Sequence, residues 1–279
     1  MKKIISLFTL AALMAGQVNA QSNPKWLRYS NISPDGKTVV FTYKGDLYTV
    51  SSSGGNATAL TMHEAHDFMP VWSKDGKTIA FASDRYGNFD VFTIPVTGGE
   101  AKRISFHSAA EYPYDFSADN QKIIFGSSRM DLASNRQFPT GSMPELYSVG
   151  VNGGRPTQLL TTPAEEVKFS KDGNKMIYQD KKGGENTWRK HHTSSIARDI
   201  WIYDVKADKH TKLTNFNGED RNPVFANAEK ELIYLSEESG SFNIHKMPVA
   251  GAKSEKLTSF KKHPVRFLST SADGTLCFS

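Results

Sequence analysis

The sequence has a single cysteine, Cys277, among its 279 residues, so an internal disulfide cannot form and stability must come from a packed core. It also lacks a strong excess of charge: the formal net charge is +5, or +3 once Lys2 and Lys3 are subtracted. That is weak evidence for a nucleic-acid partner, because such proteins concentrate positive charge on one face. After the N-terminus no apolar run approaches the roughly 20 residues of a membrane-spanning helix. We therefore expect a soluble mature protein with no membrane span.

Motifs of hydrolases, nucleotide-binding proteins and zinc proteases are missing as well. No Gly-x-Ser-x-Gly elbow occurs, and the spacing of Ser, His and Asp singles out no catalytic triad. Gly36-Lys37-Thr38 and Gly76-Lys77-Thr78 lack the earlier glycine of a phosphate loop. His63 and His66 are three residues apart, whereas a zinc helix needs four, which favours a solvated loop over a metal site. We expect no catalytic residue, no metal and no cofactor in this chain.

The N-terminus has the three parts of an export signal. Met1-Lys2-Lys3 is basic, Ile4 to Val18 is apolar, and Val18-Asn19-Ala20 offers small residues for cleavage. This pattern predicts a signal peptide over residues 1–20 and a periplasmic mature chain; a buried N-terminal helix is the less favoured alternative. No cysteine follows the cleavage point, so a lipid anchor is not indicated.

An internal repeat dominates the remaining sequence. Asn-Ile-Ser-Pro-Asp-Gly-Lys-Thr-Val-Val-Phe at 31–41 returns as Val-Trp-Ser-Lys-Asp-Gly-Lys-Thr-Ile-Ala-Phe at 71–81, and weaker copies begin at 115, 168 and 224. A sixth copy starts at Ser271 and is interrupted at Ser279. The marker positions, 40, 44, 53, 56 and 45 residues apart, are Asp35, Asp75, Asp119, Asp172, Ala228 and Asp273. Such a period is typical of propellers and other repeat folds.

Each copy contains the signals of four short strands. Asp-Gly makes a tight hairpin turn, an alternating stretch such as Asp46-Leu47-Tyr48-Thr49-Val50 forms a third strand, and Gly-Gly pairs such as Gly54-Gly55 lead into a fourth. The sequence thus predicts an all-β fold, a β-propeller of four-stranded antiparallel blades. Residues 21–279 would form five full repeats and a partial sixth, a propeller truncated within its sixth blade and six-bladed in the complete protein.

The Ser-Pro-Asp-Gly-Lys frame with its Gly-Asp-Leu-Tyr strand resembles the TolB-like repeat found in TolB, in dipeptidyl-peptidase propellers and in tricorn-type proteases. Finer stretches, 24–29, 83–90 and above all 188–201, are similar to the N-terminal propeller of secreted bacterial tricorn-like serine peptidases. Few residues separate the cleavage point from the first strand, which disfavours the leading α/β domain of TolB.

The resemblance implies a non-catalytic propeller that gates or admits peptides or unfolded polypeptide. Its partners would be the C-terminal peptidase and PDZ domains of the same parent chain, where proteolysis would occur, and a homo-oligomer is possible. The alternative is a TolB-type protein-interaction propeller that binds a cell-envelope partner.

Acidic residues recur just before each innermost strand. If the blades are radial, corresponding positions share a rim of the central channel, and their carboxylates attract the amino ends of peptides. The four residues expected at this rim are Asp67, Glu111, Glu166 and Asp220. The alternative is that each acid caps a local turn. The insertion at 179–198 is expected to be a solvated loop or a docking surface, with Trp188 and Trp201 as packing anchors.

The signal peptide yields the first testable prediction. The exported protein should begin at Gln21, because the basic start, apolar run and small exit coincide. Intact-mass measurement of protein recovered from the cell envelope checks this. A species that retains Met1 or Lys2 would contradict it.

Overall fold

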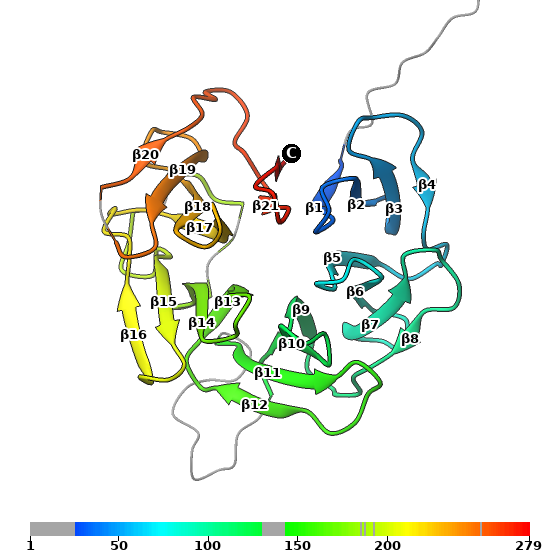
Figure 1. Ribbon diagram of the computed structural model, residues 1–279. Helices are drawn as coiled ribbons and strands as arrows, with labels where there is room; N and C mark the ends of the chain where they lie inside the picture. Colours follow the sequence, from blue (N-terminus) through cyan, green and yellow to red (C-terminus); the bar gives the residue numbers. More distant parts are fainter. Residues whose placement is uncertain (1–25, 130–142, 185, 187, 192, 252) are drawn as a thin grey trace, which may run out of the picture.

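The computed structural model of the protein describes residues 26–129, 143–184, 186, 188–191, 193–251 and 253–279. Over these residues the chain is all-β and forms five four-stranded sheets and one two-stranded sheet, set as blades around a central axis (Figure 1). The predicted propeller of antiparallel blades is confirmed. In this part of the chain no helix is long and apolar enough to cross a membrane. The predicted signal peptide, residues 1–20, lies outside the described residues.

Each full blade runs in chain order from an inner strand, next to the axis, to an outer strand (Figure 1). Blades 1 to 3 contain β1 (Arg28–Ile32), β2 (Thr38–Tyr43), β3 (Asp46–Ser51) and β4 (Thr58–Ala59); β5 (Asp67–Trp72), β6 (Thr78–Ser83), β7 (Asp90–Pro95) and β8 (Lys102–Arg103); and β9 (Glu111–Phe116), β10 (Lys122–Ser127), β11 (Glu145–Gly150) and β12 (Thr157–Leu160). Blades 4 and 5 contain β13 (Ala164–Phe169), β14 (Lys175–Asp180), β15 (Ile200–Asp204) and β16 (Lys209–Lys212); and β17 (Asp220–Ala226), β18 (Glu231–Ser236), β19 (Asn243–Pro248) and β20 (Glu255–Lys256).

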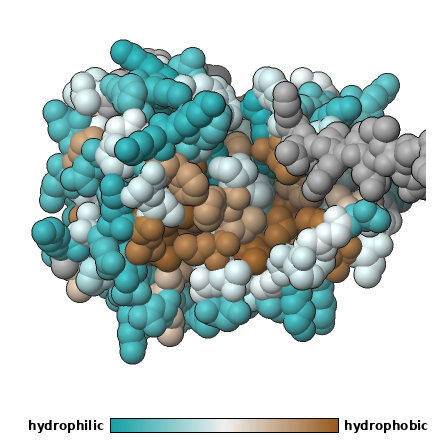
Figure 2. Space-filling view, turned by 90° about the horizontal axis from the view of Figure 1, so that it is seen from above, coloured by the Kyte–Doolittle hydropathy of each residue, from teal (hydrophilic) through white to brown (hydrophobic). Residues whose placement is uncertain are grey.

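The sixth blade contributes two described strands, β21 (Ser269–Thr270) and β22 (Leu276–Cys277). They close the ring at its inner side, because β21 contacts both β1 and β17. The Ile32 N–H donates to Ser269 Oγ at 3.1 Å, and the Ala272 N–H donates to the Pro34 carbonyl at 2.9 Å. Figure 2 shows hydrophobic residues in a hollow on the side of the molecule where the sixth blade lies.

The hairpin between the first two strands of a blade is held by a serine and an aspartate. In blade 1, Ser33 Oγ donates to Asp35 Oδ1 at 2.6 Å, and the Lys37 N–H donates to the same oxygen at 3.1 Å. These bonds, the serine's first, lower the pKa of Asp35. Gly36 completes the turn with a φ of 72°, which glycine adopts without steric cost. The serine-to-aspartate bond recurs at Ser73–Asp75, Ser117–Asp119, Ser170–Asp172 and Ser271–Asp273.

The core lies between neighbouring blades. Val40 and Leu47 of blade 1 pack against Trp72, Ile79 and Phe81 of blade 2, and all five are buried. Burying one such side chain contributes about 1.5–3 kcal/mol. Because the buried face of each sheet is completed by the next blade, a single blade has no closed core of its own.

A bulge interrupts the inner strands where they pass the axis. The pairing of β1, β5, β13 and β17 with the next strand shifts register there. At the corresponding position of five blades, one residue has a left-handed backbone conformation with φ between 50° and 53°. These residues are Tyr29, Met69, Glu166, Asn222 and Phe267. For residues other than glycine this conformation costs roughly 1–2 kcal/mol each, so the surrounding packing must hold it.

Two turns replace the glycine, and their side chains connect neighbouring blades. Asn120, at the glycine position of blade 3, has a φ of 58° and accepts the Lys74 N–H at 2.6 Å. Glu229, at the glycine position of blade 5, has a φ of 65° and accepts the Lys171 N–H at 2.6 Å. The strained backbone is therefore offset by a hydrogen bond that joins blade 2 to blade 3 and blade 4 to blade 5.

Substitutions of Glu229 separate the strain from the bond. Glu229→Ala keeps the strained φ and loses the bond, so it should lower the free energy of unfolding by about 1 kcal/mol. Glu229→Gly also loses the bond but relieves the strain, so it should be about 1 kcal/mol more stable than Glu229→Ala. Chemical denaturation measures both. Equal stability of the two variants would show that the turn is not strained.

Candidate binding site in the central channel

Three cavities follow one another along the propeller axis and share lining residues. The first, about 430 Å³, is lined by side chains that include Lys74, Lys168 and Lys171, and we call it the lysine mouth. The second, about 50 Å³, is the neck. The third, about 310 Å³, is the aromatic mouth, lined by Tyr29, Phe68, Met69, Tyr112, Tyr114, Glu165, Glu166, Gln179, Trp188, Arg221, Asn222, Arg266 and Phe267. The channel thus has two open ends of different chemistry and a narrow middle.

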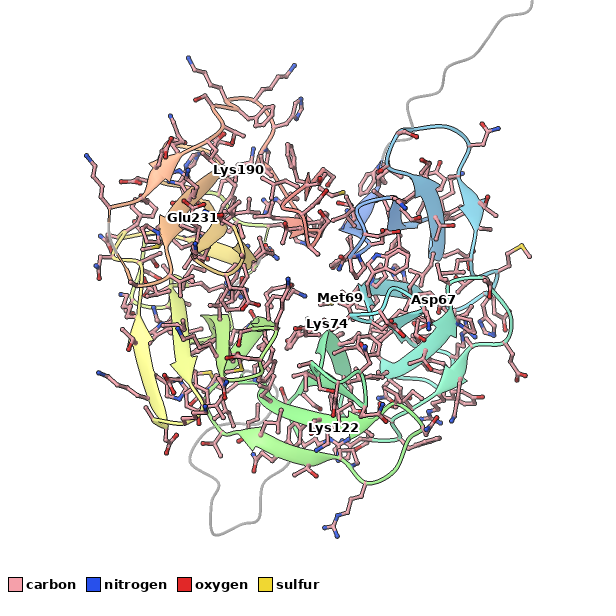
Figure 3. The ribbon with its side chains drawn as sticks, viewed as in Figure 1. Asp67, Met69, Lys74, Lys122, Lys190 and Glu231 are labelled. Carbon is pink, nitrogen blue, oxygen red and sulfur yellow. The ribbon has the colours of Figure 1, made fainter. Side chains whose placement is uncertain are left out.

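The neck is formed by the bulged inner strands. Tyr29, Met69, Glu166, Asn222 and Phe267 line both the neck and the aromatic mouth. The bulge and the left-handed backbone place these positions of five blades on the channel wall. Figure 3 shows Met69 and Lys74 beside the central opening and Asp67 farther from the axis. The strained residues therefore define the narrowest part of the channel.

Aromatic side chains of four blades touch one another around the aromatic mouth. The ring centroid of Tyr29 lies 5.3 Å from that of Phe68 and 4.5 Å from that of Phe267. Phe68 in turn lies 5.8 Å from Tyr112. Such edge and tilted contacts are favourable for aromatic rings and leave a rigid apolar wall.

Trp188 from the insertion in blade 4 joins this wall. Its ring lies 6.5 Å from that of Phe267, and the guanidinium carbons of Arg28 and Arg266 lie 4.7 Å and 5.3 Å from its centroid. Its side chain remains 49% exposed. The insertion therefore carries an aromatic residue to the channel mouth. Trp201, the second anchor expected from the sequence, stays within blade 4 and donates from Nε1 to Asp180 Oδ2 at 3.0 Å.

Opposite charges meet within the channel. Burial raises the pKa of Glu166, and Glu165 adds to this rise, whereas Lys168 and a hydrogen bond from Asn222 oppose it. Burial lowers the pKa of Lys168, although Asp115 and Glu166 favour its charged form. A carboxylate in this setting can bind an ammonium group, because a nearby positive charge recovers part of the cost of burial.

The lysine mouth is tied together by Asp115. Lys74 Nζ contacts its two oxygens at 2.6 Å and 2.8 Å, and the Phe169 N–H donates to Oδ2 at 2.9 Å. Lys168 Nζ donates to the Tyr114 carbonyl. One carboxylate thus joins blades 2, 3 and 4, so this end of the channel is held by charge-assisted bonds, whereas the other end is held by aromatic packing.

The four acids expected at the channel rim occupy different places. Glu166 lines the neck and the aromatic mouth. Asp67 and Glu111 are buried within blades 2 and 3, where Asp67 accepts from Arg85 at 2.7 Å and Glu111 from Arg129 at 2.8 Å. Asp220 is 1% exposed and lies within blade 5. That these acids bind peptide ends stays a prediction. The bulge turns Glu166 toward the channel, whereas Asp67, Glu111 and Asp220, which stand at the start of their strands, stay inside their blades.

Sequence reasoning missed the aromatic residues of the mouth. Their signal was present, because Tyr29, Phe68, Tyr112 and Phe267 stand at or near the bulge of four repeats. The histidines of the zinc-like motif, His63 and His66, are exposed in a loop between blades. Over the described residues no group of three His, Cys, Asp or Glu side chains is arranged to hold a metal.

Solved structures with this architecture include two kinds of protein. A putative TolB from Agrobacterium tumefaciens has a TM-score of 0.70 at 18% identity and matches 90% of this chain and 88% of its own. A tricorn protease has a TM-score of 0.76 at 22% identity and matches 92% of this chain but 24% of its own. At these identities the likeness concerns the fold.

The amino-acid sequence is also similar to parts of TolB and of a dipeptidyl-peptidase. The Tol-Pal system protein TolB of Helicobacter hepaticus is 31% identical over 98 residues, and dipeptidyl-peptidase 5 of Porphyromonas gingivalis is 37% identical over 67 residues. These matches cover 35% and 20% of this chain but 23% and 10% of the two relatives. The model of the tricorn protease N-terminal β-propeller domain matches residues 24–279. The chain therefore belongs to the tricorn protease N-terminal β-propeller family.

Proposed function

We propose that this chain is a non-catalytic propeller that binds and admits peptides to a periplasmic tricorn-like serine peptidase. The observation that carries the proposal is the aromatic mouth with the Glu166 carboxylate at its inner end. Aromatic walls accept apolar side chains, and a partly desolvated carboxylate accepts an ammonium group. A peptide with an apolar first residue and a free amino terminus has both features.

The neck supports admission of extended chains only. Its volume of about 50 Å³ is far below that of either mouth, so a folded protein does not fit. Peptides or unfolded polypeptide would enter at the aromatic mouth and pass Glu166 before they reach the lysines at the far end. Hydrolysis would take place in C-terminal peptidase and PDZ domains of the same parent chain, after export directed by residues 1–20.

A TolB-type function is the second candidate. It is favoured by the arrangement around Arg28, which lies between Trp26 and Trp188 at 5.0 Å and 4.7 Å from their centroids. Trp26 is 72% exposed, and tryptophan and arginine are enriched where proteins bind one another tightly. In that case the same mouth would bind a cell-envelope protein without admitting peptides.

Peptide titration of the mature chain, followed by tryptophan fluorescence, tests the proposal. A short peptide with phenylalanine first and a free amino terminus should bind roughly tenfold more tightly than its N-acetylated form, because a charge-assisted hydrogen bond contributes about 1.5–3 kcal/mol. Glu166→Gln should abolish this preference. Trp188→Phe should remove most of the fluorescence change, which assigns the signal to the mouth.

The control is Glu64→Gln, which removes the same charge from an exposed loop between blades and should leave the preference intact. Equal affinity for free and acetylated peptides would exclude recognition of the amino terminus. Binding of a folded envelope protein in the absence of any peptide binding would favour the TolB-type function.

A further inference from the structure

Blades 2 and 3 share an arrangement of an acid, an arginine and two aromatic rings. In blade 2, Arg85 contacts the buried Asp67 at 2.7 Å, and its guanidinium carbon lies 5.8 Å and 5.3 Å from the ring centroids of Phe81 and Phe92. The acid pairs with Ser83 across the first two strands, and the arginine follows that serine by two residues. We call this arrangement the acid–cation stack.

Blade 3 repeats the stack at the same register. Glu111 pairs with Ser127 across β9 and β10, and Arg129 follows that serine by two residues. Arg129 Nε donates to Glu111 at 2.8 Å, and its guanidinium carbon lies 5.5 Å and 5.1 Å from Phe125 and Tyr147. The cation compensates a carboxylate that is fully buried, and the rings hold the guanidinium plane.

Blade 4 keeps the cation and moves the acid by one strand. Asp180 stands at the position of the serine, and Lys182 follows it by two residues. Lys182 Nζ lies 3.3 Å from Asp180 and 2.6 Å from Asp199. In three consecutive blades, then, the same position in the loop supplies a positive charge to a buried carboxylate.

Blade 5 has every part of the stack except the cation. Asp220 pairs with Ser236 across β17 and β18, as Asp67 does with its serine. The ring positions are occupied by Tyr234 and His245, whose centroids are 5.8 Å apart. The position two residues after the serine, where the other blades have arginine or lysine, is Glu238.

Among the described residues, the buried groups of this site have no cationic partner. Hydroxyls of Ser236 and Thr214 act on the Asp220 carboxylate. His245 Nδ1 lies 3.9 Å from a Glu238 oxygen, and neither ring nitrogen of His245 has a hydrogen bond there. Both side chains are at least nine-tenths buried. The neighbouring Arg221 contacts Glu219 at 2.8 Å, and Lys256 lies opposite His245 on the next strand.

The charges around the site agree with a missing cation. Burial raises the pKa of Asp220 to about 7; Asp199 and Glu238 add to the rise, and the hydroxyls of Ser236 and Thr214 oppose it. Burial and, more weakly, Lys256 lower the pKa of His245, although Glu238 opposes this. At neutral pH the imidazole is therefore uncharged and does not replace the cation.

We propose that blade 5 binds the guanidinium group of an arginine presented by another polypeptide. The guanidinium would lie against Tyr234 and His245, as Arg85 lies on its two rings in blade 2. Asp220 would bind it from inside the blade and Glu238 from the solvent side. The Glu238 side chain is 56% exposed, so it can move aside to open the way. Arginine fits better than lysine because a planar guanidinium stacks on rings and binds two carboxylates at once.

The proposal does not depend on the function of the channel, but the two sites are close. Asn222, which lines the aromatic mouth, is two residues from Asp220 on the same strand. A polypeptide bound at the mouth can therefore reach the blade 5 site with a nearby arginine side chain. The site would then select partners or peptides with a basic residue.

The unpaired carboxylate predicts the pH dependence of stability. The pKa of Asp220 is about 7 in the folded protein and near the ordinary 3.8 when unfolded, so the folded form holds an extra proton between these values. With respect to Asp220, the free energy of unfolding is then highest at about pH 4 and below. It falls as the pH rises from about 4 to about 7 and changes little above that. Thermal unfolding at pH 5 and pH 8 should show that Asp220→Asn removes part of the fall; an identical pH dependence in both proteins would contradict this.

Binding is tested with argininamide as the probe, followed by the NMR signals of the His245 ring in the mature chain. At pH 8 argininamide should shift these signals in a saturable manner, and citrullinamide, its uncharged analogue, should not. Binding should weaken several-fold at pH 6, because a proton then occupies Asp220. An arginine-containing peptide that binds more tightly than argininamide would show that the ligand is a polypeptide side chain.

Glu238→Arg is the decisive variant, because it supplies the missing cation from the chain itself. It should abolish argininamide binding and raise the melting temperature at pH 8. Glu100→Arg makes the same charge change at an exposed residue and should leave both unchanged. If argininamide produces no saturable shift, or binds equally to the wild type and Glu238→Arg, the proposal is wrong.

Discussion

The packing of one blade against the next is the constraint on which this protein depends. A blade is a small sheet with strands of only two to seven residues, and its apolar face is covered by its neighbour and not by a second layer of its own. The core is therefore a set of clusters between blades. Because each interface needs the next, the inner strands must complete the ring, and β21 does so by contact with both β1 and β17.

Closure of the ring also explains where strain is located. The inner strands converge on the axis, and a bulge lets them turn without separating from the second strand of their blade. Left-handed residues such as Tyr29 and Asn222 are the result, and they form the channel wall. The turns of Asn120 and Glu229 follow the same principle, because their strained backbone directs a side chain to the preceding blade. Strain is concentrated at positions that connect blades or line the channel.

Buried charges follow the repeat as well. A carboxylate inside a blade requires a cation, and blades 2, 3 and 4 supply it from the same loop position. The repeat makes the exception in blade 5 visible, because Glu238 and His245 occupy positions whose equivalents are known within the same molecule. Blades 2 to 4 thus show which contact stabilises a buried carboxylate, and blade 5 differs from them because it lacks the cation.

The sequence by itself determined the fold class, the four-stranded blade and the positions of the hairpins, because turn residues and alternating apolar residues act over a few neighbours along the chain. Aspartate, glycine and the Asp46–Val50 pattern were sufficient for this. The direction of side chains at the axis was decided only by the tertiary structure. The bulge moves Glu166 into the channel wall, while the acids before it, such as Asp67, stay inside their blades. Likewise, Trp188 contacts Arg28 and Phe267 at the mouth. Both are far from it in the sequence, so no local pattern could place it there.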